Sequence, residues 1–299
     1  MRVLVAGGNG FVGTHLCREL VDRGHEVTVL ARTPDEDDLP EGVDAVVGDV
    51  TAIDSLEPAV ADRDAVVNLV ALSPLSVPDG GNEMHDLVHR RGTENLVTAA
   101  EQAGVDRFVQ MSALGADPDG DTAYIRAKGR AETAVRKSDL SWVVFRPSVV
   151  FGEGGEFVSF TKRLKRMFAP GVPVYPLPGG GKTRFQPIYV GDLATMLADG
   201  VEADEHAEKT YDIGGPESLT LREITELVYE SEGKNVTIIS LPMALAGVGL
   251  TVLDVVPGFP MGPDQYRSLK FDNTTSENDV GAFGVDEEEL LTFREYLGV

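Results

Sequence analysis

Short apolar runs alternate with amphipathic helical patterns through the first half of the chain. The run Arg2–Ala6 precedes a glycine-rich turn, after which apolar residues recur with helical spacing from Phe11 to Val21. A strand, a turn and a helix in this order are typical of a βαβ opening. Further buried strands are predicted at 26–30, 45–47, 65–70, 107–111, 142–145 and 211–213, with helical patterns at 93–103 and 122–136.

This alternation predicts parallel strands joined by crossover helices, so we expect an α/β fold with a doubly wound parallel sheet. After Pro147 the chain changes to loops rich in Gly and Pro, followed by a helix from Leu219 and a broken apolar segment, Leu241–Met261. We therefore expect two domains. The first takes residues 1–148 plus about 183–214, and a smaller α+β domain takes about 149–182 plus 215–299.

Composition narrows the class of protein. The chain has 299 residues, 42% of them apolar, and its start lacks the pattern of a secretory leader, so we expect a globular cytoplasmic protein. It carries 49 acidic and 26 basic residues, a net charge of −23, which disfavours nucleic acid and anionic lipid as partners. Dispersed acids with few Lys predict a halophilic protein, because concentrated salt screens their mutual repulsion. The single cysteine, Cys17, excludes an internal disulfide and is predicted to face the core.

A glycine motif of the form GxxGxxG follows the first strand and opens the first helix. Gly7 allows a tight turn, Gly10 lets the backbone approach a pyrophosphate, and Gly13 allows close helix packing. The helix N-terminus adds unpaired N–H groups and a positive dipole, which favour phosphate. We predict a Rossmann domain that binds NAD(P) here, against the alternative of a purely structural turn. The cofactor-binding residues predicted in the motif are Gly7, Asn9, Gly10, Phe11, Val12 and Gly13.

The second strand ends in Leu30-Ala31-Arg32-Thr33, without the acid that binds the ribose hydroxyls of NAD. A guanidinium at Arg32 suits a 2′-phosphate, so we expect NADP(H) to be favoured over NAD(H). The alternative is a solvated surface Arg.

A second constellation consists of Ser112, Tyr124 and Lys128. Tyr and Lys four residues apart share one helix face, and Ser112 ends the preceding strand. An ammonium beside a phenol is expected to lower its pKa, while a nearby hydroxyl orients a substrate oxygen. The pattern indicates a dehydrogenase-type site, although Tyr and Lys alone would also suit an exposed helix face.

Together these motifs resemble the extended short-chain dehydrogenase/reductase proteins. The segments 111–117, 124–128 and 178–194 make the chain most similar to the atypical branch that contains the nucleotide-binding accessory subunit of mitochondrial complex I and its prokaryotic relatives. The resemblance implies adenine-side contacts by Asp49 and Val50, an adenosine-side wall at Val70 and Ala71, and a nicotinamide contact at Pro147. Because that mitochondrial member holds NADPH as a structural subunit, cofactor binding alone does not imply turnover.

The chain departs from the extended pattern at His89, where Asn is usual. This puts a proton relay through that position in doubt, unless His89 replaces the Asn. His85 and His89 also have a spacing that suits zinc, but no third ligand is indicated, so no metal site is expected.

We expect hydride transfer between NADPH and a carbonyl or alcohol of a small-molecule substrate. Tyr124 is the expected acid/base, Lys128 holds ribose and lowers the Tyr124 pKa, and Ser112 orients the substrate.

The alternatives are a nucleotide-sugar epimerase or dehydratase, a cofactor-holding subunit or assembly factor of a respiratory membrane complex at the inner face of the membrane, and a redox sensor of the NmrA-like kind. Leu241–Met261 is read as a lid, or else as a surface for a membrane neighbour or a lipophilic substrate. The sequence does not specify the oligomeric state.

Overall fold

The computed structural model describes residues 1–35, 38–168, 174–243 and 262–299. The chain forms two compact units. Unit 1 contains residues 1–72, 78–147 and 190–212, and unit 2 contains residues 73–77, 148–189 and 213–299. The segment 183–189, placed in the first domain by the sequence, is grouped with unit 2 in this division.

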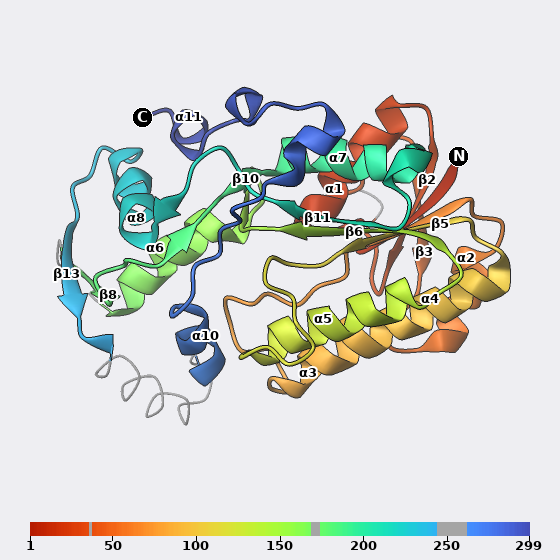
Figure 1. The fold of residues 1–299 in the computed structure, drawn as a ribbon, viewed down its shortest axis with the longest axis horizontal. Coiled ribbons are helices and arrows are strands. Elements are labelled where there is room, and N and C mark those ends of the chain that lie inside the picture. The colour runs from red at the N-terminus through yellow and green to blue at the C-terminus, as the bar shows by residue number, and fades with distance from the viewer. Residues whose placement is uncertain (36–37, 169–173, 244–261) are drawn as a thin grey trace. The chain divides into compact units, whose positions relative to one another are not determined.

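Unit 1 is built on a seven-stranded sheet with the order β11-β6-β5-β4-β1-β2-β3 (Figure 1). Its strands are β1 (Arg2–Ala6), β2 (Glu26–Ala31), β3 (Val43–Val47), β4 (Ala65–Asn68), β5 (Arg107–Met111), β6 (Ser141–Pro147) and β11 (Lys209–Ile213). The pairings from β3 through β6 are all parallel. The order reverses between β1 and β4, which is where open α/β sheets bind ligands at the carboxyl ends of their strands. The expected doubly wound Rossmann fold is confirmed.

Helices cover both faces of this sheet. The helices α1 (Phe11–Asp22) and α7 (Val190–Glu202) lie side by side on one face, and α4 (Gly92–Ala103) and α5 (Ala123–Arg136) lie on the other (Figure 1). Shorter helices in the unit are η2 (Ile53–Ser55), α2 (Glu57–Val60), α3 (Glu83–His85), the π-helical η3 (Asp86–Arg91) and η4 (Asp204–His206).

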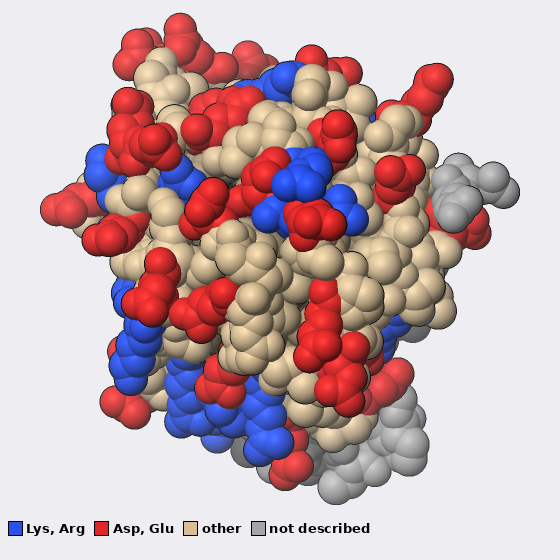
Figure 2. Space-filling model, turned by 90° about the vertical axis from the view of Figure 1, so that its right-hand side faces the viewer, with Lys and Arg blue, Asp and Glu red and all other residues tan. Residues whose placement is uncertain are grey.

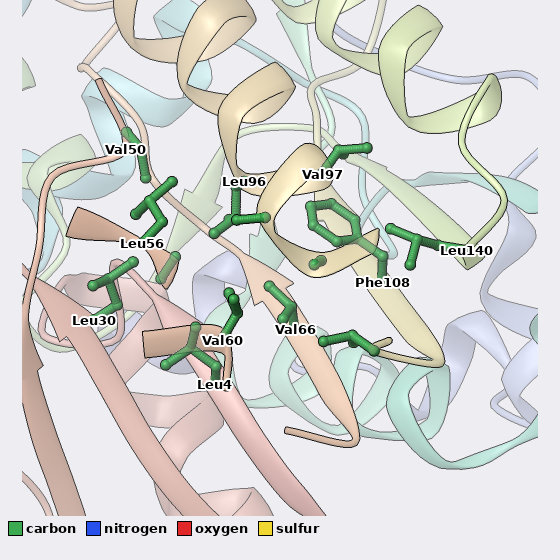
Figure 3. Packing of buried hydrophobic residues seen from close by; sticks show 14 of the residues in the cluster. Leu4, Leu30, Val50, Leu56, Val60, Val66, Leu96, Val97, Phe108 and Leu140 are labelled. Carbon is green, nitrogen blue, oxygen red and sulfur yellow. The ribbon is translucent and has the colours of Figure 1, made fainter. Parts of the chain in front are cut away.

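One apolar layer fills the space between the sheet and α4. Figure 3 shows Leu4, Val66 and Phe108 from three neighbouring strands directed toward Leu96 of α4, and all four are fully buried. Strands covered on both faces are apolar at successive positions, which explains why the sequence indicated them clearly. Cys17 is buried in α1, as predicted.

Unit 2 contains short strand pairs and helices around an aromatic core. Phe151, Phe157 and Phe293 pack there with Ile224 and Val228. The strand pairs are β7 (Val150–Phe151) with β10 (Ile188–Tyr189), β9 (Arg184–Phe185) with β12 (Leu219–Thr220), and β8 (Val174–Pro178) with β13 (Thr237–Leu241). The helices are α6 (Glu156–Phe168), α8 (Leu221–Glu230), α10 (Pro263–Ser268), η5 (Asp279–Phe283), η6 (Glu287–Glu289) and α11 (Phe293–Leu297).

The predicted helix near Leu219 begins at Leu221, because Thr220 caps it. The Thr220 side chain accepts a hydrogen bond from the amide of Glu223, and the Glu223 carboxylate accepts one from the amide of Thr220. Most of the apolar segment Leu241–Met261 lies outside the described residues. Within the described part of the chain, no helix has the length and apolar character needed to cross a membrane.

Acidic side chains are spread over the face of the molecule shown in Figure 2 and are not gathered in one patch. This distribution agrees with the scattered acids of the sequence. Halophilic behaviour remains a prediction.

Candidate functional site

The glycine motif forms a turn that only glycine fits. Gly7 has a φ of +79°, and its amide donates to the carbonyl of Leu30. A Cβ atom at Gly13 would lie 2.4 Å from the carbonyl oxygen of Gly7, so the first turn of α1 packs directly on the loop. Gly10 occupies the N-cap of α1 and offers no side chain to its amides. This end of α1 is therefore open to an anion.

The segment after β4 lies against the same turn. A Cβ at Gly7 would lie 3.1 Å from the amide nitrogen of Val70. The buried Asn68 fixes this segment, because its Oδ1 accepts a hydrogen bond from the Val70 amide. Val70 is half-buried and Ala71 is exposed. The structure thus brings the glycine turn together with the predicted adenosine-side wall.

Residues at the end of the site predicted to bind the phosphates and the adenosine half of the cofactor, here called the nucleotide end, are less enclosed. Asn9 is exposed, Phe11 is half-buried with its ring against His15, and Val12 is buried. Arg32 follows β2, is exposed, and forms no ion pair with the described side chains. A guanidinium in this setting is available to a 2′-phosphate. The preference for NADP(H) stays a prediction.

Asp49 and Val50 follow β3 and have structural partners of their own. One carboxylate oxygen of Asp49 accepts hydrogen bonds from the amide and the hydroxyl of Thr51. Val50 is 6% exposed and belongs to the apolar layer beneath α4, and its carbonyl accepts a hydrogen bond from Asn95. The Val50 side chain therefore contributes to packing, and the adenine contact of this pair stays a prediction.

Tyr124 and Lys128 lie on the first turns of α5. The helix begins after Thr122, whose hydroxyl accepts a hydrogen bond from the amide of Ile125. The Lys128 side chain is buried, with its Nζ 5.8 Å from the centre of the Tyr124 ring. Its Nζ donates to the carbonyl of Met111, the last residue of β5, at a distance of 3.0 Å. The predicted pair does share one helix face, on which Lys128 is buried and Tyr124 is half-buried.

Ser112 and Pro147 complete this part of unit 1. Ser112 is 2% exposed, its amide donates to the carbonyl of Phe145, and its hydroxyl has no partner among the described residues. Pro147 ends β6, and its carbonyl accepts a hydrogen bond from the amide of Leu114. A buried hydroxyl without a partner is unfavourable unless an incoming group satisfies it, so the Ser112 hydroxyl is a candidate contact for a substrate oxygen.

The electrostatics differ from the sequence-based expectation. Burial lowers the pKa of Lys128 to about 8, although the charge of Glu132 opposes this shift. Burial also raises the pKa of Tyr124 above its ordinary value. The predicted lowering of the Tyr124 pKa is therefore wrong for this structure, because the ammonium of Lys128 bonds to a backbone carbonyl and desolvation dominates at the phenol. Tyr124 is a protonated phenol at neutral pH, which is the form that donates a proton.

Two buried histidines surround the Tyr124 ring. The ring centres of His85 and His89 lie 5.6 and 5.3 Å from that of Tyr124, both nearly edge-on, and 5.3 Å from each other. His89 projects from the π-helical η3, and insertions of this kind are frequent at functional sites. In the sequence, the two histidines have a spacing that suits zinc, but without a third ligand no metal site is expected there. The i, i+4 spacing is the only signal in the sequence, whereas the packing of α3 and η3 on α5 shows that both rings lie against Tyr124.

These residues fit a nicotinamide dinucleotide. The glycine turn has no room for side chains at Gly7 or Gly13, and the helix it opens has no cap. At the other end, an amine, a phenol and an unpartnered hydroxyl come from neighbouring elements. The first group of features suits phosphates, and the second suits ribose hydroxyls and a reacting oxygen.

Comparison with known proteins establishes the family. A family model described as NAD(P)H-binding matches residues 7–167, more than half of the chain, and the chain belongs to this family. It is 28% identical over 295 residues to the mitochondrial NADH dehydrogenase (ubiquinone) 1 alpha subcomplex subunit 9 of Arabidopsis thaliana, which covers 92% of this chain and 71% of that protein. The predicted likeness to complex I accessory subunits is confirmed.

One further relative and one solved structure have other named activities. The chain is 28% identical over 279 residues to the chloroplastic divinyl chlorophyllide a 8-vinyl-reductase of Cucumis sativus, covering 88% of this chain and 64% of that protein. The structure resembles that of UDP-glucose 4-epimerase from Thermus thermophilus in complex with NAD, with a TM-score of 0.73, 24% identity, and coverage of 99% and 96% of the two chains. At this identity the likeness shows the fold.

Proposed function

We propose that the chain is an NADPH-linked oxidoreductase that interconverts a carbonyl and an alcohol. The observation that carries this proposal is the pairing of half-buried Tyr124 with buried Lys128 on one face of α5. Lys128 donates to the carbonyl of Met111, and the next residue, Ser112, has a buried hydroxyl without a partner among the described residues. Membership of the NAD(P)H-binding family and the uncapped start of α1 support the cofactor.

Each end of the cofactor has its own residues in this proposal. The backbone of the turn from Gly7 to Gly13 holds the pyrophosphate, and Arg32 pairs with the 2′-phosphate that distinguishes NADP from NAD. Lys128 uses one donor on Met111, so its remaining N–H groups are available to ribose hydroxyls. The backbone at Pro147 takes the carboxamide.

Reduction needs a hydride and a proton, and a bound nicotinamide would supply the hydride. The phenol of Tyr124 donates its proton to the carbonyl oxygen of the substrate, and Ser112 donates a hydrogen bond to the same oxygen. The raised pKa of Tyr124 keeps this proton in place until the substrate oxygen gains negative charge. Oxidation of an alcohol requires the phenolate of Tyr124, which the raised pKa makes scarce at neutral pH, so reduction is the favoured direction.

Turnover tests the proposal. The protein, kept in molar KCl, is loaded with NADPH and challenged with a panel of aldehydes and ketones, including long-chain ones, while oxidation of NADPH is followed. Wild-type protein is expected to oxidise NADPH with some members of the panel. Tyr124→Phe is expected to slow this by about 10²- to 10⁴-fold while binding NADPH normally. Equal turnover by Tyr124→Phe would remove Tyr124 from its role.

A cofactor-holding subunit of a membrane complex is the second candidate. It is favoured by the relative named as a subunit of mitochondrial NADH dehydrogenase, which aligns over 92% of this chain. This function predicts tight NADPH binding, a stable protein partner in membrane extracts, and no oxidation of NADPH by the carbonyl panel. An epimerase would instead convert a nucleotide sugar without net oxidation of its cofactor, and product analysis identifies it.

A further inference from the structure

His89 accepts a backbone hydrogen bond at the centre of the candidate site. Its side chain is 2% exposed, and its Nε2 lies 2.8 Å from the amide nitrogen of Leu72. Because an amide N–H only donates, Nε2 carries no proton, and a neutral ring must carry its proton on Nδ1. Nδ1 is buried and has no hydrogen-bond partner among the described residues.

The surroundings keep this ring neutral. Burial, the positive charge of Lys128 and the neighbouring His85 hold the pKa of His89 well below its ordinary value. The acceptor at Nε2 therefore persists at neutral pH. A ring that receives a proton at Nε2 must first release the Leu72 amide, so this nitrogen is poorly placed for a proton relay.

The bonded amide lies at a junction of the chain. Leu72 is the last residue of unit 1 before the segment 73–77, which belongs to unit 2. Two residues earlier, the Val70 amide donates to Asn68 and lies beside the glycine turn. Within unit 2, the carbonyl of Pro74 accepts a hydrogen bond from Gln265. Hydrogen bonds to Asn68 and Gln265 therefore fix the backbone of this segment on both sides of the junction.

We propose, building on the proposed function, that His89 is a positioning residue that holds segment 70–72 against the glycine turn. The same ring lies edge-on against Tyr124 at a centre-to-centre distance of 5.3 Å. One side chain therefore fixes the wall of the cofactor site relative to the proton donor. Asn at this position would be too short to reach Leu72, so the departure from the usual Asn changes the role of the position.

Two substitutions distinguish the role of Nε2 from that of Nδ1. The amide group of Gln extends about as far as Nε2, so His89→Gln keeps an acceptor for Leu72 but places nothing at Nδ1. His89→Asn places its amide near Nδ1 and leaves Leu72 without a partner. His89→Ala removes both. His25→Gln serves as a control at a histidine that precedes β2 and whose Nε2 lies 2.6 Å from a carboxylate oxygen of Glu202. Thermal unfolding checks that every variant is folded.

The first readout is hydrogen exchange at the Leu72 amide, which requires no cofactor. His89→Gln and the control are expected to exchange within about threefold of wild type, and His89→Asn and His89→Ala about tenfold faster. The second readout is the Kd for NADPH by calorimetry, expected to follow the same order. Equal exchange in all variants would overturn the proposal, as would rescue of NADPH binding by Asn and not by Gln. If wild-type protein binds no NADPH, the proposed function fails, and the exchange result still decides whether His89 holds the segment.

Discussion

The two ends of the candidate cofactor site are held in different ways. Around Tyr124, buried His85 of α3 and His89 of η3 lie against the ring, and buried Lys128 donates to the backbone carbonyl of Met111 at the end of β5. At the nucleotide end, Arg32 is exposed and has no ion-pair partner among the described residues. At the buried end, desolvation of Lys128 lowers its pKa and costs stability. The exposed end relies on a single charge that water and salt also compete for.

The glycine turn is shared by both ends, and changing it should have the largest effect. Gly13→Ala places a Cβ 2.4 Å from the Gly7 carbonyl, so the turn must move. We expect destabilisation by about 2–3 kcal/mol and a loss of NADPH affinity of at least about a hundredfold. Calorimetry and thermal unfolding measure both effects.

The matched control is Gly281→Ala, because a Cβ there meets no atom within 4 Å. Ala is favoured over Gly in a helix by about 1 kcal/mol. If helix propensity alone decided the outcome, Gly13→Ala would therefore stabilise α1. A Gly13→Ala protein that binds NADPH as tightly as wild type would show that the turn does not carry the phosphates.

Lys128→Met should stabilise the protein while it removes activity. The pKa of Lys128 is lowered from 10.5 to about 8, so below about pH 8 folding requires a buried charge. Between about pH 8 and 10.5 the unfolded chain binds the extra proton, so wild-type stability rises with pH. We expect Lys128→Met to be more stable at neutral pH by on the order of 2 kcal/mol, allowing for the lost bond to Met111.

Denaturant unfolding of apo-protein across this pH range checks the prediction, with the exposed Lys137→Met as the control. The advantage of Lys128→Met should shrink as the pH approaches 10.5. A stability difference that does not depend on pH would show that Lys128 is not desolvated as the structure indicates.

The smallest effect is expected at the exposed end. Arg32→Ala should weaken NADPH binding by about tenfold, since one charge-assisted contact at an exposed site is lost. NADH binding should change less than twofold, and this internal comparison is the control. Equal weakening of both nucleotides would assign Arg32 to the shared part of the cofactor, and no change would leave it a solvated residue.

The strands can be predicted from the sequence more accurately than the side-chain contacts of the candidate site. The predicted bounds of β1 match the structure because residues 3–6 form a continuous buried apolar run. The bounds of β5 also match, although the polar residues Arg107 and Gln110 lie among its apolar ones. The pairing of β8 with β13 joins segments about sixty residues apart, and no local pattern indicates it. Helix spacing predicts that Tyr124 and Lys128 share a face, and they do. The joint role of both residues with Ser112 stays a prediction. The two histidines around Tyr124, and the rise in its pKa, depend on packing and burial that spacing does not encode.

Transfer of the hydride itself tests the account most directly. NADPH carrying deuterium at the transferred position of nicotinamide is incubated with wild-type protein or Tyr124→Phe and with the carbonyl compounds of the panel. The account predicts that deuterium appears on the carbinol carbon of the alcohol with wild-type protein, and that Tyr124→Phe binds the same NADPH but transfers deuterium at least about a hundredfold more slowly. Tight NADPH binding by wild-type protein without transfer to any carbonyl would contradict the catalytic function and favour a protein that only holds its cofactor.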